Sequence, residues 1–381
     1  MKSVIGVVLC AALSSGPNMA HAHALPDPAD IDAKVAELMQ RTSAQGIAVA
    51  VIDQGRPVYV QAFGKRNADG DPLKTDTVMY GASLTKTVFA YTVARWADQG
   101  RVSLDTSIAE FLPRPLPSYA GTDIVNRYAD FTALDERWRR LTPRILLNHG
   151  SGFANFGFLE PDEKLRFHFD PGTRYAYSGD GLATLQFALE HGLGLDVGAG
   201  TNAIFRELGM HRTALIWRAD FASNLADGWD IQGRLEPHDE RSKVRAAGSM
   251  DTTIADLALF AAAFVRGDGL SPQAHRDMLR PQLQITTRSQ FPTLQPELPP
   301  AQRRKDLAAG LGVVVFQGPQ GAGFFKGGHN DTTANTLVCV QKRQRCLLVL
   351  SNDVRADGGF EELVRYVLGE TGVPYDWEYG R

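Results

Sequence analysis

The sequence predicts an α+β fold, an α/β sandwich in which an antiparallel sheet is flanked by helices and carries an inserted, mainly helical lobe. β-rich runs gather near both ends of the chain, at 46–64 and 311–350, and successive short strands joined by turns are typical of an antiparallel sheet. From about residue 112, strand alternation is absent for more than a hundred residues. We therefore expect a sheet domain made of residues 25–111 and 245–381 and a mainly helical domain of residues 112–244, with the functional site at the seam.

The first part of the sheet domain is predicted to contain a helix, a hairpin and a second helix. Apolar residues at helical spacing indicate a helix over 31–40, with Asp30 placed to cap it. Two β-rich runs within 46–64 are separated by a short polar segment, which indicates a hairpin. An apolar segment with neither glycine nor proline then follows Ser83 and stops at Gly100, which predicts a buried helix.

The second part of the sheet domain is predicted to contain a helix, four strands and a last helix. A strongly apolar helical pattern lies within 246–265 and begins at Thr252 and Thr253. A polar, proline-rich loop covers about 282–304. The four β-rich runs and the final helix follow at 311–316, 323–326, 336–340, 347–350 and 359–368.

The first 24 residues have the pattern of a secretory signal peptide. A basic residue precedes an apolar run over 4–13, and alanine alternates with histidine over 20–24. The apolar run is too short to span a bilayer. We expect cleavage near Ala22 or Ala24 and an exported protein, periplasmic or secreted, without stable membrane insertion once the signal is removed. A lipid anchor on Cys10 is the alternative.

Two cysteines lie outside this leader, Cys339 and Cys346. They flank the segment between the last two β-rich runs. If Lys342 and Arg343 form a two-residue hairpin turn, the two cysteines lie directly opposite each other. A cross-strand disulfide, which an oxidising compartment permits, and a pair of buried thiols both fit this placement.

The composition excludes several classes of function. The 381 residues are 44% hydrophobic and 22% charged, with a formal net charge of −3, which is ordinary for a globular protein and lacks the basic excess of a nucleic-acid-binding protein. The sequence contains no zinc-binding histidine pattern, no phosphate-binding or dinucleotide-binding glycine loop and no Gly-x-Ser-x-Gly elbow. We expect no nucleic-acid partner, no metal and no other cofactor.

A serine and a lysine stand one helical turn apart at the start of the predicted buried helix, in Ser83-Leu84-Thr85-Lys86. Residues at i and i+3 share a helix face, so Lys86 is placed to reach the Ser83 hydroxyl. The first backbone N–H groups of a helix have no intrahelical partner and stabilise a developing anion. A nucleophile, a base and an anion-binding pole therefore lie within four residues. The alternative is an N-cap serine followed by a solvated lysine.

Two further stretches complete an ordered set of motifs: Tyr177-Ser178-Gly179 and Lys326-Gly327-Gly328. With the three motifs in this order, the chain resembles the penicillin-recognising serine hydrolases, which are the serine β-lactamase and penicillin-binding-protein superfamily. Within that superfamily it resembles the class C β-lactamase-related enzymes. That superfamily includes D,D-carboxypeptidases, D-aminopeptidases and esterases, and its motifs are Ser-x-x-Lys, Tyr-x-Asn and Lys-Thr-Gly. The segments 100–105, 146–152 and 247–250 are also similar to the superfamily, and the resemblance covers about residues 30–370.

The resemblance implies a role for each motif residue. Ser83 is the expected nucleophile, and its base is either Lys86 in its neutral form or Tyr177 as a phenolate held between two cations. Lys326 is expected to attract a substrate carboxylate or to hold the tyrosine in place. The backbone N–H groups of Ser83 and His329 are expected to form the oxyanion hole.

Glycines also bear on the site. Gly328 suits a close backbone approach at the oxyanion hole. Gly179 and Gly327 replace the Asn and the Thr of the superfamily motifs, both of which normally hydrogen-bond the substrate. Because a site loses discrimination when such a partner is missing, these two changes argue against efficient β-lactam hydrolysis.

Other polar and aromatic residues near the motifs are interpreted as structural. His149 is expected to be a hydrogen-bonded core histidine, Ser151 a turn residue and Asp180 a loop carboxylate without a role. The aromatic residues near them are expected to pack in the interior: Phe153, Phe156 and Phe158.

The function predicted from the sequence is that of an exported serine hydrolase. It would form an acyl-enzyme through Ser83 with a small-molecule or peptide substrate, namely an ester, an amide or D-peptide, or a β-lactam. The alternative is a penicillin-binding-like sensing or binding module that no longer turns over. The sequence leaves the substrate and the oligomeric state open.

Overall fold

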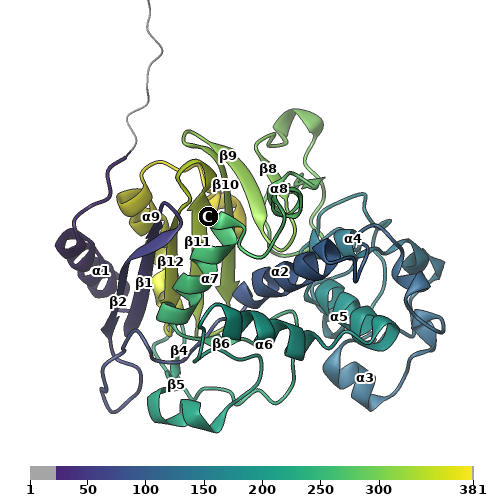
Figure 1. Cartoon of the computed structure of the whole chain (residues 1–381), viewed down its shortest axis with the longest axis horizontal. Coiled ribbons are helices and arrows are strands. Elements are labelled where there is room, and N and C mark those ends of the chain that lie inside the picture. Colours follow the sequence, from purple (N-terminus) through teal and green to yellow (C-terminus); the bar gives the residue numbers. More distant parts are fainter. Residues whose placement is uncertain (1–22, 380–381) are drawn as a thin grey trace, which may run out of the picture.

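The computed structural model describes residues 23–379 (Figure 1). The predicted leader, apart from its last two residues, and Cys10 lie outside this range. The fold of the described residues is mixed α and β: an antiparallel sheet with helices on both faces and a group of helices to one side (Figure 1). The α+β class predicted from the sequence is confirmed.

Eight strands form the main sheet of the described residues, in the order β2-β1-β12-β11-β10-β9-β8-β7, and every neighbouring pair is antiparallel. The two ends of the chain meet in it, because β1 pairs with β12 and places Val49 opposite Val349. The strands are β1 (Gly46–Asp53), β2 (Arg56–Gly64), β7 (Leu283–Gln284), β8 (Leu307–Ala309), β9 (Val314–Gly318), β10 (Gly321–His329), β11 (Ala334–Val340) and β12 (Arg345–Ser351).

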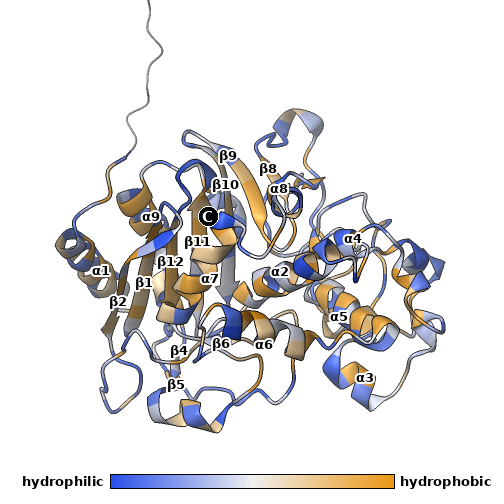
Figure 2. Ribbon diagram, viewed as in Figure 1, coloured by the Kyte–Doolittle hydropathy of each residue, from blue (hydrophilic) through white to orange (hydrophobic). Residues whose placement is uncertain are grey.

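Helices bury both faces of the sheet. Along β1, alternate side chains enter two different core clusters, as the period of two of a strand requires. On one face, α7 (Ile254–Arg266) packs on β1, β2 and β12. On the other, α1 (Pro28–Thr42) packs on β1 and β2, and α9 (Phe360–Leu368) on β12. Figure 2 shows the hydrophobic residues concentrated along these strands and on the sides of the helices that meet them.

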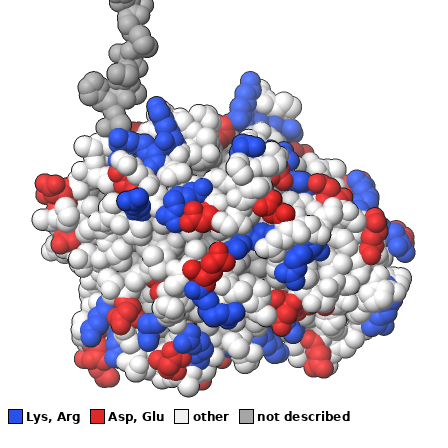
Figure 3. All heavy atoms as spheres, viewed as in Figure 1, with Lys and Arg blue, Asp and Glu red and all other residues white. Residues whose placement is uncertain are grey.

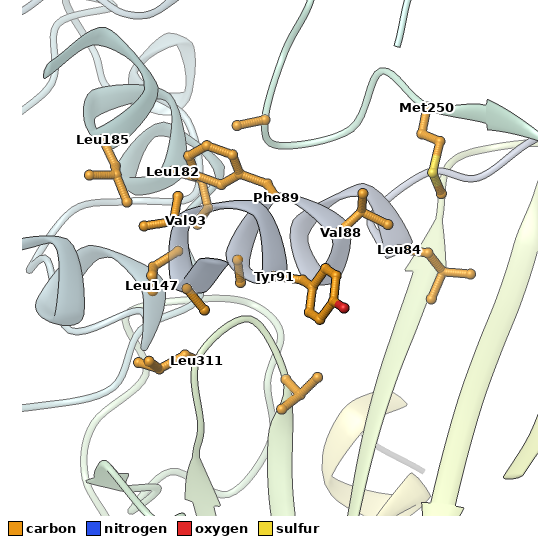
Figure 4. Packing of buried hydrophobic residues seen from close by; sticks show 14 of the residues in the cluster. Leu84, Val88, Phe89, Tyr91, Val93, Leu147, Leu182, Leu185, Met250 and Leu311 are labelled. Atoms are coloured by element: carbon orange, nitrogen blue, oxygen red, sulfur yellow. The ribbon is translucent and has the colours of Figure 1, made fainter. Parts of the chain in front are cut away.

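The helix that begins after Ser83, α2 (Leu84–Asp98), is buried almost all round. Of its 15 residues, all but three are buried, as expected for a helix that is surrounded by other elements. It contacts α6 (Val197–Glu207), α8 (Pro272–Leu279), β10 and β11. In Figure 4, Phe89 and Val93 of α2 lie beside Leu182 of α5 (Gly179–Leu193). This helix therefore connects the sheet with the helical part of the chain.

Helices α3 (Thr122–Arg127), α4 (Pro143–Leu147) and α5 lie on the side of α2 away from the strands, and α6 runs beside α2 (Figure 1). The middle of the chain is mainly helical and loop-rich, but it contains the two-residue strands β4 (Gly228–Trp229) and β5 (Leu235–Glu236), which were not predicted. Strands this short leave no alternation for a sequence pattern to show. The domain boundaries stay a prediction.

The predicted sheet was incomplete at one edge. The loop predicted over 282–304 contains β7, and β8 follows it. Both strands have three residues or fewer, and edge strands are often short. The helix after β6 (Asp251–Thr252) begins at Ile254, with Thr253 as its N-cap, as the threonine pair predicted.

Cys339 and Cys346 pair directly across β11 and β12 and form a disulfide. The predicted two-residue turn at Lys342 and Arg343 was wrong: the strands are joined by four residues, and Gln344 has the left-handed φ of 47°. A two-residue turn of the type that suits a hairpin needs positive φ at one or both central residues, which lysine and arginine disfavour. The longer loop keeps the same register.

Figure 3 shows lysine and arginine interspersed with aspartate and glutamate over the visible face, without a large area of one sign. None of the helices in residues 23–379 combines the length and hydrophobicity needed to cross a membrane. Within the same residues, no cluster of three or more histidine, cysteine or acidic side chains is arranged to hold a metal ion.

Candidate active site

A tight turn places Ser83 at the start of α2. The short strand β3 (Met79–Tyr80) leads into it, and the Gly81 N–H donates to the Met250 carbonyl at 2.8 Å. Ala82 has the left-handed φ of 46°, an unfavourable conformation for a residue with a side chain. Such backbone strain concentrates at functional sites. Ser83 then occupies the N-cap position of α2, where its side chain makes no capping hydrogen bond.

The three side chains predicted to be catalytic meet at one atom. Ser83 Oγ lies 2.9 Å from Lys86 Nζ and 2.8 Å from the Tyr177 hydroxyl. Lys86 also donates to the Ala247 carbonyl and is only 1% exposed. Ser83 thus occupies the N-cap position of the alternative interpretation, but the solvated lysine of that interpretation is wrong, because Lys86 is buried against the serine.

Lys326 approaches from the sheet. It lies on β10, and its Nζ is 5.1 Å from the centre of the Tyr177 ring, while Lys86 Nζ is 5.0 Å from the same centre. Its Nζ donates to the Gly327 carbonyl at 2.6 Å. The phenol thus has two amines near its ring, a geometry in which cations are attracted to the π face.

Gly328 lies where β10 passes the start of α2. A Cβ at this position would be 3.1 Å from the Ser83 nitrogen, closer than side chains ordinarily allow, so the glycine permits this approach. His329, the next residue, ends β10 and has its Nε2 3.3 Å from Asp357 Oδ1. The backbone N–H of His329 as an oxyanion donor stays a prediction.

Burial controls the charge of the two lysines. It lowers the pKa of Lys86 well below the usual value, and the nearby Lys326 cation lowers it further, while Asp180 opposes both. Burial also lowers the pKa of Lys326 to about 8, against the raising effect of Glu378. A neutral amine beside Ser83 is the form that accepts a proton, so the environment suits Lys86 as the base.

The environment of Tyr177 acts in the other direction. Burial raises the pKa of its phenol above the usual value, although the hydrogen bond with Ser83 lowers it. Burial therefore favours the neutral phenol over a phenolate, and which of Lys86 and Tyr177 acts as the base stays a prediction. A neutral phenol suits proton donation better than proton removal.

The residues interpreted as structural have mostly that role. His149 stacks on the Tyr177 ring at 4.6 Å, and its Nδ1 accepts the Ser178 N–H at 3.1 Å. Burial lowers the pKa of His149, so it is neutral. Ser151 is buried and its hydroxyl accepts the Phe153 N–H, as in a turn.

Asp180 is more than a loop carboxylate. It lies in the first turn of α5, 7% exposed, and accepts the Gly157 N–H at 2.6 Å. Burial raises its pKa to about 7. Its negative charge, where present, raises the pKa of Lys86, so Asp180 acts on the base from outside the pocket.

The side chains around Ser83 enclose a pocket of about 420 Å³. Sequence reasoning missed several residues that line it, among them Asn155, Arg245, Gln290, Phe291 and Glu378. They come from three loops and the C-terminal helix α10 (Tyr375–Tyr379), and no local motif marks them. Phe156, which was expected to pack in the interior, also lines the pocket, whereas Phe153 is buried as expected.

The wall near Gly179 differs from the superfamily pattern in a specific way. A Cβ at Gly179 would lie 2.4 Å from the Phe156 ring, so the ring fills the space that an asparagine side chain there would need. A carboxamide nevertheless lies close by, because Asn155 Oδ1 accepts the Gly179 N–H at 2.9 Å. This bond directs the amide nitrogen of Asn155 away from the Gly179 backbone.

The fold and the site define a β-lactamase-fold serine hydrolase, and a family comparison identifies the chain as one. The Beta-lactamase family model matches residues 31–369, so the chain belongs to that family.

Curated relatives agree with this assignment. The chain is 29% identical over 296 residues to a human (Homo sapiens) protein, putative beta-lactamase-like 1, covering 69% of this chain and 56% of that protein. It is 30% identical over 164 residues to the lovastatin esterase of Penicillium rubens, covering 36% of this chain and 40% of that enzyme. The chain thus spans about half the length of these relatives or less.

Solved structures share the fold. The D-alanine carboxypeptidase AmpC of Burkholderia cenocepacia superposes with a TM-score of 0.69 at 17% identity, covering 90% of this chain and 99% of that one. A penicillin-binding protein homologue of Pyrococcus abyssi gives 0.67 at 19% identity, covering 87% and 74%. Identities this low establish the architecture, and the chemistry rests on the residues above.

Proposed function

We propose that this chain is an exported hydrolase that cleaves carboxylic esters through a Ser83 acyl-enzyme. The observation that carries the proposal is the convergence on Ser83 Oγ of Lys86 Nζ at 2.9 Å and the Tyr177 hydroxyl at 2.8 Å. Amides, D-peptides and β-lactams share the acyl-transfer chemistry. Esters come first because Gly179 and Gly327 lack the polar groups that recognise the others.

In the acylation step, neutral Lys86 takes the Ser83 proton while the oxygen attacks the ester carbonyl. The negative charge that develops on the carbonyl oxygen is stabilised by the backbone N–H groups of Ser83 and His329, each typically worth about 3–4 kcal/mol. Tyr177 donates a proton to the leaving alkoxide and is reprotonated from Lys86. The products are an alcohol and the Ser83 ester.

In the deacylation step, the same groups act on water. A water molecule attacks the Ser83 ester, its proton passes to the neutral amine of Lys86, and the serine oxygen leaves and regains a proton. The net reaction consumes one water and gives one carboxylic acid and one alcohol. The lovastatin esterase relative supports an ester substrate, as a likeness over part of this chain.

The test is steady-state hydrolysis of a panel of p-nitrophenyl esters, D-amino-acid amides and nitrocefin by the purified protein and by its Ser83→Ala variant. We expect ester turnover that the variant lacks, and slower or no turnover of nitrocefin. Ester turnover that survives Ser83→Ala would overturn the nucleophile assignment. Labelling of Ser83 without turnover of any substrate would instead support a sensing or binding module.

The proposal of export rests on two observations. The leader pattern precedes the domain, and the disulfide between Cys339 and Cys346 is of a kind found mainly in oxidising compartments. N-terminal sequencing of the mature protein tests it. A first residue at 23 or 25 supports export as a free protein, a lipidated first residue at Cys10 supports export as an anchored protein, and an uncleaved leader would contradict export.

A further inference from the structure

Aromatic side chains stay exposed at the mouth of the pocket. Phe158 is 65% exposed, its neighbour Leu159 is 61% exposed, and Phe291 is 45% exposed. The two phenylalanines belong to different loops, and Phe156 and Phe291 line the pocket that contains Ser83. Exposed apolar side chains that gather around a pocket mark a surface that binds an apolar group. We call Phe156, Phe158 and Phe291 the aromatic rim.

One side of the rim is built by a stack. The rings of Phe156 and Phe158 are 5.0 Å apart and nearly parallel, at 11°. The Phe156 ring is fixed from behind, because it occupies the space left by the missing side chain of Gly179. With glycine at position 179, this wall of the pocket is formed by the Phe156 ring in place of a polar asparagine side chain.

The other side of the rim lies next to the catalytic phenol. The Phe291 ring meets the Tyr177 ring edge-on at 5.3 Å, and the Tyr177 hydroxyl contacts Ser83. One side chain therefore separates Phe291 from the nucleophile. When Ser83 Oγ attacks the carbonyl carbon of a substrate, a group bonded to that carbonyl therefore lies within reach of Phe291.

The loop that carries Phe291 is held in place before any ligand binds. The Phe291 carbonyl accepts hydrogen bonds from Gln295 Nε2 at 3.0 Å and from Ser289 Oγ at 2.9 Å. The next residue toward the N-terminus, Gln290, accepts the Tyr175 hydroxyl at 2.9 Å and donates its N–H to the Trp377 carbonyl at 2.8 Å. Because the loop is already ordered, a ligand that binds there pays little conformational entropy for ordering it.

We propose that the aromatic rim is a subsite for an apolar group, of about the size of a ring, attached next to the scissile carbonyl. The preferred substrates are then esters that carry an aromatic or branched aliphatic substituent, and short esters are poor ones. The inference rests on the proposed function, because it concerns the substrate of the same Ser83 site.

Two series of esters test the subsite and identify the side of the ester that occupies it. In the first, the p-nitrophenyl leaving group is fixed and the acyl group grows from acetyl through butyryl to phenylacetyl. In the second, the acyl group is fixed as acetyl and the alcohol changes from ethyl to benzyl. The quantity compared is the ratio of kcat/KM between the largest and the smallest member of each series.

The variants are Phe291→Ala, Phe156→Ala and the conservative Phe291→Leu, with Ile231→Ala as the matched control. Ile231 is 62% exposed and lies outside the lining of the pocket. In at least one series, we expect the wild-type ratio to favour the large group and each alanine variant to reduce that ratio by about tenfold or more. Phe291→Leu should retain most of the wild-type preference for the large group, and Ile231→Ala should leave that preference unchanged.

Labelling of Ser83 by a fluorophosphonate, measured for every variant, separates this inference from the proposed function. If the wild-type protein shows neither labelling nor turnover, the proposed function is contradicted. Normal labelling and turnover without preference for the larger group in either series overturns the subsite. A preference that survives both alanine variants overturns it as well.

Discussion

The floor and the rim of the pocket are built in opposite ways. The floor consists of Ser83, Lys86, Tyr177 and Lys326, and all but the partly exposed serine are buried. Short hydrogen bonds join Ser83 to Lys86 and Tyr177, and Lys326 lies beside the Tyr177 ring. The aromatic rim is apolar, comes from loops and is partly open to solvent. The floor keeps the serine, the two lysines and the tyrosine of the motifs, whereas the two departures from those motifs, Gly179 and Gly327, are not part of it.

The difference separates reactivity from recognition. Reactivity depends on amines whose pKa is lowered by burial, which only a closed and densely packed floor provides. Recognition depends on which surface meets the rest of the substrate, and loop residues can change without altering that floor. The following predictions test whether the two regions are as independent as this account requires, from the largest expected effect to the smallest.

The site should lose most of its catalytic activity when the residue at position 86 cannot become a neutral base. Lys86→Ala should lower kcat/KM by roughly a hundredfold to ten-thousandfold, the usual contribution of a general base. Lys86→Arg should be about as damaging, because a guanidinium keeps its charge at any working pH. Ester hydrolysis by both variants is the measurement, and a near-wild-type rate for Lys86→Arg would show that position 86 serves only as a cation.

The packing of the rim against the start of α5 should be cooperative at one contact, that of Phe156 with Gly179. Gly179→Ala places a methyl group 2.4 Å from the present position of the Phe156 ring and should cost about 1–3 kcal/mol of stability through overpacking. In the Phe156→Ala background the same substitution should cost much less. Urea unfolding of the two single variants and the double variant measures this coupling. Strictly additive effects would mean that the ring does not fill the space at Gly179.

The pH dependence of the floor follows from its two amines. Lys86 acts when neutral, so kcat/KM should rise with pH through its lowered pKa. Lys326 acts as a cation, so kcat/KM should fall as pH rises through its pKa of about 8. Glu378 raises that pKa, and Glu378→Gln should therefore move the alkaline limb to lower pH.

The matched control for that experiment is Glu370→Gln, which removes an exposed carboxylate that lies outside the pocket lining. Its pH profile should overlay that of the wild-type protein. An alkaline limb that stays in place in Glu378→Gln would show that Glu378 does not control Lys326.

Removing the disulfide should have the smallest effect on activity. Cys339 and Cys346 pair on the far part of β11 and β12, and neither lines the pocket. The double substitution Cys339→Ala and Cys346→Ala should lower the free energy of unfolding by about 2 kcal/mol, as expected for a short closed loop, with kcat/KM unchanged. Unfolding curves and ester hydrolysis measure the two effects, and a large loss of kcat/KM would link the disulfide to the site.

Much of the floor could be predicted because its signals are local or ordered along the chain. The spacing of Ser83 and Lys86 places them on one helix face, and the sheet could be derived from alternation and turn signals. Tyr177 and Lys326 were found through the order of the family motifs. Their convergence on Ser83 depends on tertiary packing, which the order only implied.

The rim could not be predicted, for physical reasons. The position of Phe156 depends on contact with Gly179, and that of Phe291 on hydrogen bonds within a loop of irregular sequence. Glu378 reaches the pocket from a five-residue helix that no pattern distinguishes. The direction in which the surroundings shift the pKa of Tyr177 could not be predicted either, because the sequence shows neighbouring charges but not the extent of burial.

The central claim is that Ser83 is made nucleophilic by Lys86 on a preformed floor. The most direct test is mass spectrometry of the intact protein after brief reaction with a fluorophosphonate probe, followed by peptide mapping. The account predicts one adduct, on the peptide that contains Ser83, which forms at least a hundredfold more slowly in Lys86→Arg. An adduct on another residue, or equal rates for the two proteins, would contradict it.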